Sequence, residues 1–128
     1  MIVLDTHAWL WMQADPARMS DPARAAIETA DRIGVCTISC WEIAMLVRAG
    51  RIRMDRDART WIRQALASER LEAIPLTAVA AVTAALLPAG FPGDPADRII
   101  YATALGLGAR LVTRDERISS FDRLRTLW

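Results

Sequence analysis

The sequence predicts an α/β fold with a parallel sheet covered by helices on both faces. Short apolar runs of strand length recur along the chain, and helical patterns separate them. Such alternation is typical of parallel sheets, whose right-handed crossovers place helices on the two faces. At 128 residues the chain has the length of one compact domain, so we expect a single domain over residues 1–128.

The expected strands are the apolar runs at residues 2–4, 33–37, 71–76, 110–113 and 124–128. The longer helices are expected at residues 21–30, 39–49, 57–69, 77–87 and 94–107. Proline follows aspartate at the start of the first and last of these helices, and Gly50 ends the second. Short helices are expected after Asp5 and Asp115, because each of these residues suits an N-cap.

The composition argues against several classes of protein. No apolar run approaches the roughly 18 residues of a membrane-spanning helix, and the N-terminus shows no secretory signal, so we expect a cytoplasmic protein without membrane contact. Two cysteines and one histidine are too few for a disulfide framework or a structural zinc site. The net charge of +1 predicts no general attraction to nucleic acid.

The positive charge is nevertheless concentrated in one segment. All basic residues of the chain are arginines, and six of them lie between Arg48 and Arg63 against only two aspartates. The simpler explanation is a solvated charged face. The alternative is a rim that binds phosphate groups, because the guanidinium fork binds phosphate bidentately. The candidates for that role are Arg51, Arg53 and Arg56.

Four carboxylates lie where expected strands end or expected helices begin: Asp5, Glu42, Asp97 and Asp115. Parallel strands end along one edge of a sheet, and ligands bind outside that edge, so these acids can meet there. Without a counter-ion they would repel by about 1 to 4 kcal/mol per close pair. Mg²⁺ or Mn²⁺ would relieve the repulsion, and metal-assisted phosphodiester hydrolysis is the chemistry that such a cluster suits.

Helix capping is a structural explanation for the same acids. Ser39 with Glu42 fits a capping box, and Asp94 with Asp97 fits an N-cap and its N3 partner. Capping and metal binding are compatible, since a capping acid is held rigidly at the end of a strand. Both roles therefore stay open.

Four motifs contain these acids: MIVLDTH from Met1, ISCWEI from Ile38, FPGDPADR from Phe91 and LVTRDE from Leu111. Together they resemble the PIN-domain family, in particular the VapC-type toxins of bacterial toxin–antitoxin pairs. The resemblance implies a three-layer α/β/α sandwich with a parallel sheet of about five strands, and a Mg²⁺- or Mn²⁺-dependent endoribonuclease. It also implies a homodimer, and a small antitoxin protein that blocks the groove beside the acids.

The resemblance assigns roles by position in the motifs. Asp5 and Asp97 match the metal ligands. Glu42 matches an acid that completes the metal's coordination, and Asp115 matches one that holds a second ion or orients water. All four acids are thus catalytic candidates. The supporting candidates are Thr6, Asp94, Arg98 and Thr113.

Two of the supporting candidates have specific alternatives. Asp94 shares a motif with Asp97, which we favour as the ligand because Asp94 suits the N-cap. Arg98 would bridge acids or contact phosphate. His7 has either a catalytic or a packing role.

The apolar residues near the acids suggest a protein surface. Most of the five tryptophans are expected in the core. We hypothesise that Trp9 or Trp11, and the helix near Trp61, lie at the dimer or antitoxin surface.

Two alternatives to a nuclease remain. One is a catalytically silent PIN-like module that binds RNA or protein, although such modules usually lack some of the acids. The other is a metal-dependent phosphatase, but haloacid-dehalogenase enzymes carry Asp-x-Asp after the first strand, where this chain has Asp5-Thr6-His7.

Overall fold

The apolar runs form one parallel sheet in the computed structural model, which describes residues 1–128. Its strands are β1 (Ile2–Leu4), β2 (Ile33–Cys36), β3 (Leu71–Ile74), β4 (Arg110–Val112) and β5 (Thr126–Leu127). They lie in the order β3-β2-β1-β4-β5, and every neighbouring pair is parallel. The predicted parallel sheet of about five strands is confirmed, although most of its strands end earlier than expected.

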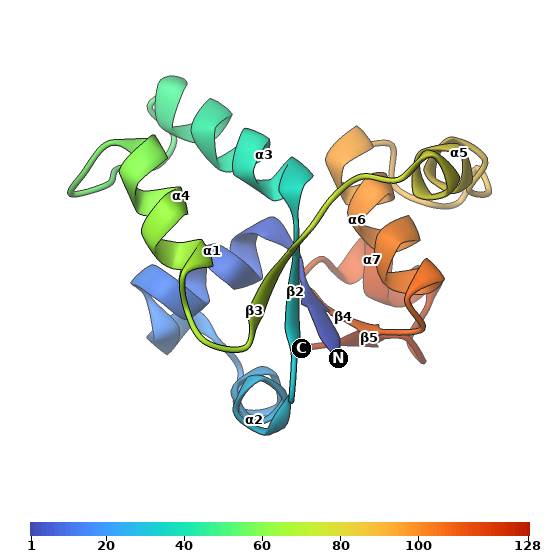
Figure 1. The fold of residues 1–128 in the computed structure, drawn as a ribbon. Helices are drawn as coiled ribbons and strands as arrows, with labels where there is room; N and C mark the ends of the chain where they lie inside the picture. The colour runs from blue at the N-terminus through green and yellow to red at the C-terminus, as the bar shows by residue number, and fades with distance from the viewer.

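The helices are α1 (Thr6–Ala14), α2 (Asp21–Thr29), α3 (Thr37–Arg48), α4 (Ala58–Leu66), α5 (Ala78–Ala85), α6 (Pro95–Gly106) and α7 (Glu116–Phe121). A 3₁₀ turn, Pro16–Arg18, follows α1. Figure 1 shows the sheet nearly edge-on, with α1, α3 and α4 on one side and α5, α6 and α7 on the other. No helix has the length and apolar character needed to cross a membrane.

Alternate residues of each strand supply the two cores, because successive side chains of a strand point to opposite faces. Leu4 and Val112 belong to the core under α1, α3 and α4, whereas their neighbours Val3 and Leu111 belong to the core under α6 and α7. All four side chains are at most 1% exposed. This burial on both faces is typical of parallel sheets.

Of the alternatives Trp9 or Trp11, the structure excludes Trp9 as a surface residue, and on the helix near Trp61 the Trp61 side chain itself faces the core. Trp9 is fully buried, Trp61 is 7% exposed, and their rings pack 5.4 Å apart in the core under α1 and α4. Trp11 is only partly buried, against Trp128. The exposed tryptophan is instead Trp41 on α3, with 58% of its surface accessible.

Helix α3 begins earlier than the sequence suggested. Its N-cap is Cys36, which makes no side-chain capping bond, so the predicted capping box of Ser39 and Glu42 is wrong. Ser39 lies inside the helix, fully buried, and accepts a hydrogen bond of 2.9 Å from the Thr6 hydroxyl. Starting α3 directly after β2 puts Glu42 in its second turn.

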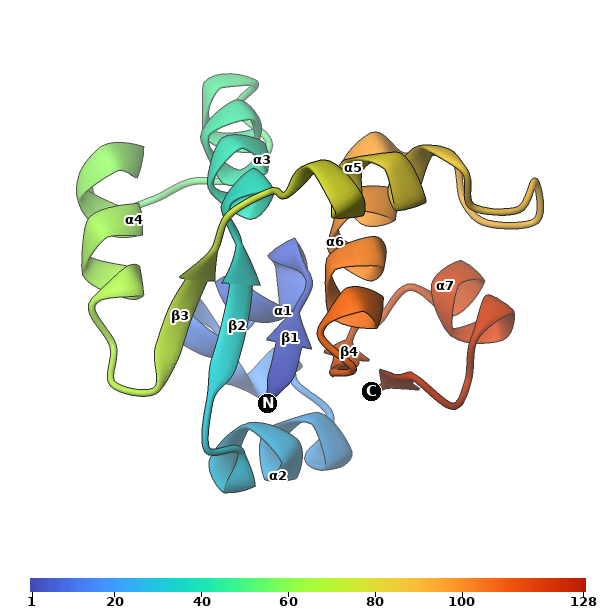
Figure 2. The same cartoon turned by 45° about the vertical axis from the view of Figure 1, so that its right-hand side comes forward.

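Strand β1 is the point at which the order of strands across the sheet changes direction. From β1 the chain adds β2 and β3 on one side and, later, β4 and β5 on the other. Ligand sites in such sheets lie beyond the strand ends at this reversal. Figure 2 shows that α1 and α3 leave this edge and that α6 starts near it before running back along the sheet.

Candidate active site

An all-polar cavity of about 190 Å³ lies at the carboxyl edge of the sheet. It is lined by Asp5, Thr6, His7, Glu42, Asp94, Asp97, Asp115 and Arg117. The four acids singled out in the sequence therefore share one cavity. A larger cavity of about 370 Å³, beside α5 and α6, is lined by no titratable side chain.

Asp5 is the most buried acid of the cavity. Its backbone N–H continues the pairing of β1 with β4 by donating to the Val112 carbonyl, and its carboxylate caps α1 by accepting from Ala8 N–H at 2.7 Å. Burial raises the pKa of Asp5, and the charge of Glu42 adds to the rise, while a hydrogen bond with Thr113 opposes it most. The carboxylate is thus fixed in place at an electrostatic cost.

Asp94 and Asp97 belong to the start of α6. Asp94 is the N-cap, and its carboxylate accepts from the Asp97 N–H at 3.0 Å, as the sequence predicted. Burial raises the pKa of Asp97 to about 7, and the next contributions are the negative charges of Asp94, Glu42, Asp5 and Asp115. The cavity holds more negative charge than its polar surroundings compensate.

Asp115 behaves differently from Asp97, although both lie in the same cavity. It is the N-cap of α7, and its backbone N–H donates to the hydroxyl of buried Thr113 at 3.0 Å. Its carboxylate accepts from the Arg117 guanidinium at 2.7 and 3.2 Å. This contact holds the pKa of Asp115 below its usual range.

Arg98 contacts backbone carbonyls and not the acids of the cavity. Its guanidinium lies over the Phe91 ring and donates to the carbonyls of Ala84, Pro92 and Leu87, at 3.0, 3.3 and 3.1 Å respectively. The expectation that Arg98 bridges the acids is wrong. Because it satisfies carbonyls at the end of α5 and in the following loop, its role is to hold that loop against α6.

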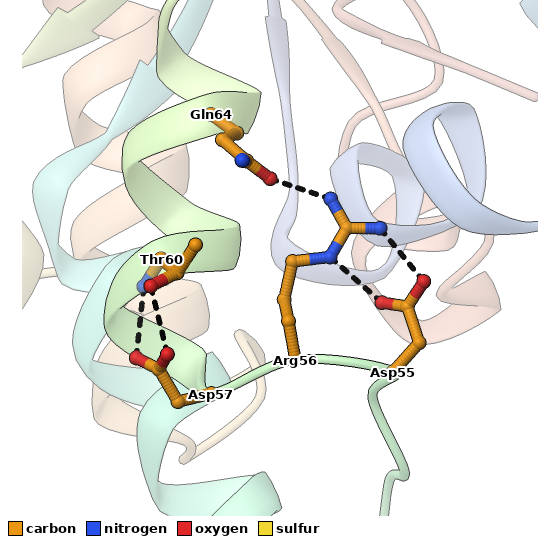
Figure 3. Close-up of polar contacts among 5 residues, drawn as sticks. All are labelled: Asp55, Arg56, Asp57, Thr60 and Gln64. Atoms are coloured by element: carbon orange, nitrogen blue, oxygen red, sulfur yellow. Dashed lines mark hydrogen bonds and ion pairs between the residues drawn. The ribbon is translucent and has the colours of Figure 1, made fainter.

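The arginine-rich segment does not line the cavity and runs from the last residue of α3, through the loop, into α4. Figure 3 shows Arg56 held by both carboxylate oxygens of Asp55, at 2.8 Å each, and by the Gln64 side chain. Asp57 caps α4 by accepting from Thr60. Arg51 and Arg53 are exposed and form no ion pair. These two are the better phosphate candidates.

Sequence reasoning missed Arg117 as a residue of the cavity. The only signal was its place two residues after Asp115, in the first turn of an expected short helix. That spacing alone does not tell whether the side chain turns back to the acid.

The side chains of the cavity have the chemical type of ligand that a hard divalent cation prefers. Its five carboxylates offer only oxygen ligands, which magnesium and manganese prefer. A cation would also offset the repulsion that raises the pKa of Asp97. As they stand, no three His, Cys, Asp or Glu side chains are close enough to form a ready-made metal site. An ion would therefore have to draw the carboxylates together.

Comparison with known proteins agrees with the fold and the motifs. The PIN domain family model matches residues 2–124. Ribonuclease VapC22 of Mycobacterium tuberculosis is 43% identical over 129 residues, covering 99% of this chain and 98% of that protein.

Solved structures share the fold at lower sequence identity. VapBC2 from Rickettsia felis, bound to a promoter DNA fragment, has a TM-score of 0.72 and 19% identity, covering 99% of this chain and 98% of that one. VapC20 of Mycobacterium tuberculosis, described as a toxin that cleaves the sarcin-ricin loop, has a TM-score of 0.67 and 16% identity, covering 98% and 99%. The prediction of the family is confirmed, and the chain belongs to the PIN domain family.

Proposed function

We propose that this protein is an endoribonuclease of the VapC type, the toxin of a toxin–antitoxin pair, which hydrolyses RNA phosphodiester bonds at the acidic cavity. The observation that carries the proposal is the convergence of four acids from separate segments in one polar cavity. The relative with 43% identity is named a ribonuclease. Together these favour hydrolysis of RNA over the silent module and the phosphatase.

Asp5 and Asp97 would hold a Mg²⁺ or Mn²⁺ ion, and Glu42 and Asp115 would complete its coordination or hold a second ion. A bound ion would offset the charge that builds up on the phosphate during hydrolysis. The other side chains position these acids. Asp94 orders the first turn of α6 below Asp97, Thr6 joins α1 to α3 through Ser39, and Thr113 supports Asp115.

The supporting contacts explain why the acids stay in place despite their repulsion. Asp5, Asp94 and Asp115 each accept a backbone N–H at the start of a helix. Helix N-termini favour negative charge, so the fold stabilises acids there. Holding these acids together for metal binding would therefore lower the free energy of unfolding only modestly.

Partners follow from the proposed toxin function. Solved relatives of the same fold include the toxin–antitoxin complex of Klebsiella pneumoniae, with a TM-score of 0.70, 17% identity and coverage of 100% of this chain and 97% of that one. An antitoxin that covers the cavity is supported by Trp41 and Met45, which are 58% and 42% exposed on the helix that carries Glu42.

The proposed homodimer is supported by a second apolar surface. Val79 and Val82 on helix α5 and Leu86 at its C-cap are 76%, 58% and 77% exposed, and a contiguous exposed apolar surface is typical of a protein contact. We place the protein in the cytoplasm, where RNA and a co-expressed antitoxin would meet it.

Cleavage of total cellular RNA tests the function. The wild type is expected to cleave with Mg²⁺ or Mn²⁺ and to lose activity in EDTA. Asp97→Asn should abolish cleavage, whereas Asp94→Asn, which keeps a good N-cap, should retain more of it. No metal-dependent cleavage by folded wild type, or equal activity of all three proteins, would contradict the proposal.

A further inference from the structure

Arg117 is the only arginine that lines the acidic cavity. Its Nε lies 3.2 Å from Asp115 Oδ1, its Nη2 lies 2.7 Å from Oδ2, and its backbone N–H donates to Oδ1 at 2.9 Å. Both oxygens of Asp115 therefore accept from this one residue. None of the other four carboxylates in the cavity takes part in an ion pair.

The guanidinium also interacts with the rest of the cluster. The hydrogen bond with Asp115 contributes most to the raised pKa of Arg117, and the negative charges of Asp97 and Asp94 contribute further. Arg117 is thus a counter-ion for one end of the cavity. The end that holds Asp5 and Asp97 has no ion pair, the charge of His7 opposes the shift of Asp5 only in part, and the pKa of both acids is raised there.

The contact is easily broken. The Arg117 side chain is 69% exposed, while Asp115 is 23% exposed. An ion pair with one solvated partner contributes little to stability, so the guanidinium can move into solvent without disturbing the core. Asp115 would remain in place, because the Arg117 backbone N–H still donates to it and Thr113 still accepts from its N–H.

We propose that Arg117 competes with a divalent cation for Asp115. Asp5 and Asp97 would hold a first ion, and Asp115 would be a better ligand for a second ion once Arg117 has moved away. A carboxylate has lone pairs enough for two partners. A guanidinium and a divalent cation on the same carboxylate would nevertheless repel each other, so each weakens the binding of the other to Asp115.

This inference rests on the proposed metal site, and it means that Arg117 controls when Asp115 is available to a metal ion. Arginine forks bind phosphate as well as carboxylate. An RNA phosphate that enters the cavity would offer Arg117 an alternative partner, and Asp115 would then be released while substrate is present.

Direct measurement of Mn²⁺ binding tests the competition without relying on activity. Isothermal titration calorimetry and the electron paramagnetic resonance of free Mn²⁺ would be recorded for the wild type, Arg117→Ala, Asp115→Asn and the double variant. Arg117→Ala is expected to raise the affinity of the weaker site about two- to fivefold, the range of an exposed ion pair. In the Asp115→Asn background the same change should have no effect.

Two further variants serve as controls. Arg117→Lys keeps the charge and loses the fork, so its affinity should lie between those of the wild type and Arg117→Ala. Arg123→Ala removes an exposed arginine that does not line the cavity and should leave binding unchanged.

The outcomes separate the two proposals. Equal increases with and without Asp115 would mean that Arg117 acts only as a distant charge, and this would overturn the competition. An Arg117→Ala protein that binds Mn²⁺ like the wild type would overturn it too, and would leave the proposed metal site intact. If the folded wild type binds no Mn²⁺, the metal site and the competition both fail.

Discussion

The acidic cavity and the arginine-rich segment each contain an aspartate that caps a helix, Asp5 in the cavity and Asp57 before α4. Both carboxylates accept the N–H three residues later. Asp5 is buried among other acids and its pKa is raised, whereas Asp57 is exposed and hydrogen bonds with Thr60 lower its pKa. The local role is the same, and the surroundings decide whether the acid has unused capacity to bind a cation.

The largest expected difference between the two caps is in catalysis. Asn is as good an N-cap as Asp, so Asp5→Asn and Asp57→Asn should both keep their helices. Asp5→Asn removes a charge from the proposed metal site and should lower the cleavage rate more than about a hundredfold, since loss of an outer-shell partner alone costs up to that much. Asp57→Asn should cleave at the wild-type rate.

The measurement is the initial rate of cleavage of one RNA with Mg²⁺, at matched thermal stability. Comparable rates for the two variants would show that the cavity has no special role in catalysis.

A smaller effect concerns pH and stability without metal. The pKa of Asp97 rises from 3.8 unfolded to about 7 folded, so between these values the folded protein binds more protons than the unfolded chain. The contribution of Asp97 to stability is therefore greatest below pH 4 and falls as pH rises toward 7. Asp57, whose pKa is lowered, behaves in the opposite way: its contribution is present at neutral pH and is lost as pH falls through the acidic range.

Asp97→Asn should thus match the wild type near pH 4 and become more stable by roughly 1 to 2 kcal/mol at neutral pH, after allowance for partial exposure. Asp57→Asn should show no such gain. Urea unfolding in EDTA across this pH range measures both. A difference between Asp97→Asn and the wild type that does not vary with pH would contradict the raised pKa.

The smallest expected effect lies in the arginine-rich segment. If Arg51 and Arg53 contact RNA phosphates, each alanine variant should reduce the salt dependence of binding by about 0.7 in the log–log slope for single-stranded RNA. Arg56→Ala should leave the slope unchanged, because Asp55 already neutralises Arg56. RNA binding would be titrated with NaCl in the uncleaving Asp5→Asn background. If all three variants keep the slope of the parent protein, the arginines are a solvated face that does not contact RNA.

The sequence predicted the features that depend on local pattern. Strand positions follow from apolar runs, and Asp94 could be recognised as an N-cap because proline and a second acid follow it. The meeting of Asp5 and Asp97 could be expected because parallel strands end along one edge. These predictions require only the positions and parallel orientation of the strands, and no knowledge of how side chains are placed.

The features that were missed depend on three-dimensional packing. The start of α3 carries no capping signal, since Cys36 makes no side-chain cap, so the sequence pointed to Ser39 instead. Arg98 and Arg117 are both arginines close to an acid, and only the folded loops show that Arg98 turns to backbone carbonyls while Arg117 turns to Asp115. The sequence could not decide between Trp9 and Trp11 as a surface residue, because the full burial of Trp9 depends on packing against α4, far along the chain.

The loop between α5 and α6 divides the acids between two stretches of chain. Asp5 and Glu42 precede it, whereas Asp97 and Asp115 follow it, and β1 pairs with β4 across the division. Residues 88–90 of this loop are exposed, so the chain can be cut there with little loss of packing. Neither fragment would carry a complete cavity. Cleavage of RNA by a mixture of the two fragments would then require them to associate, so the activity would report their reassembly.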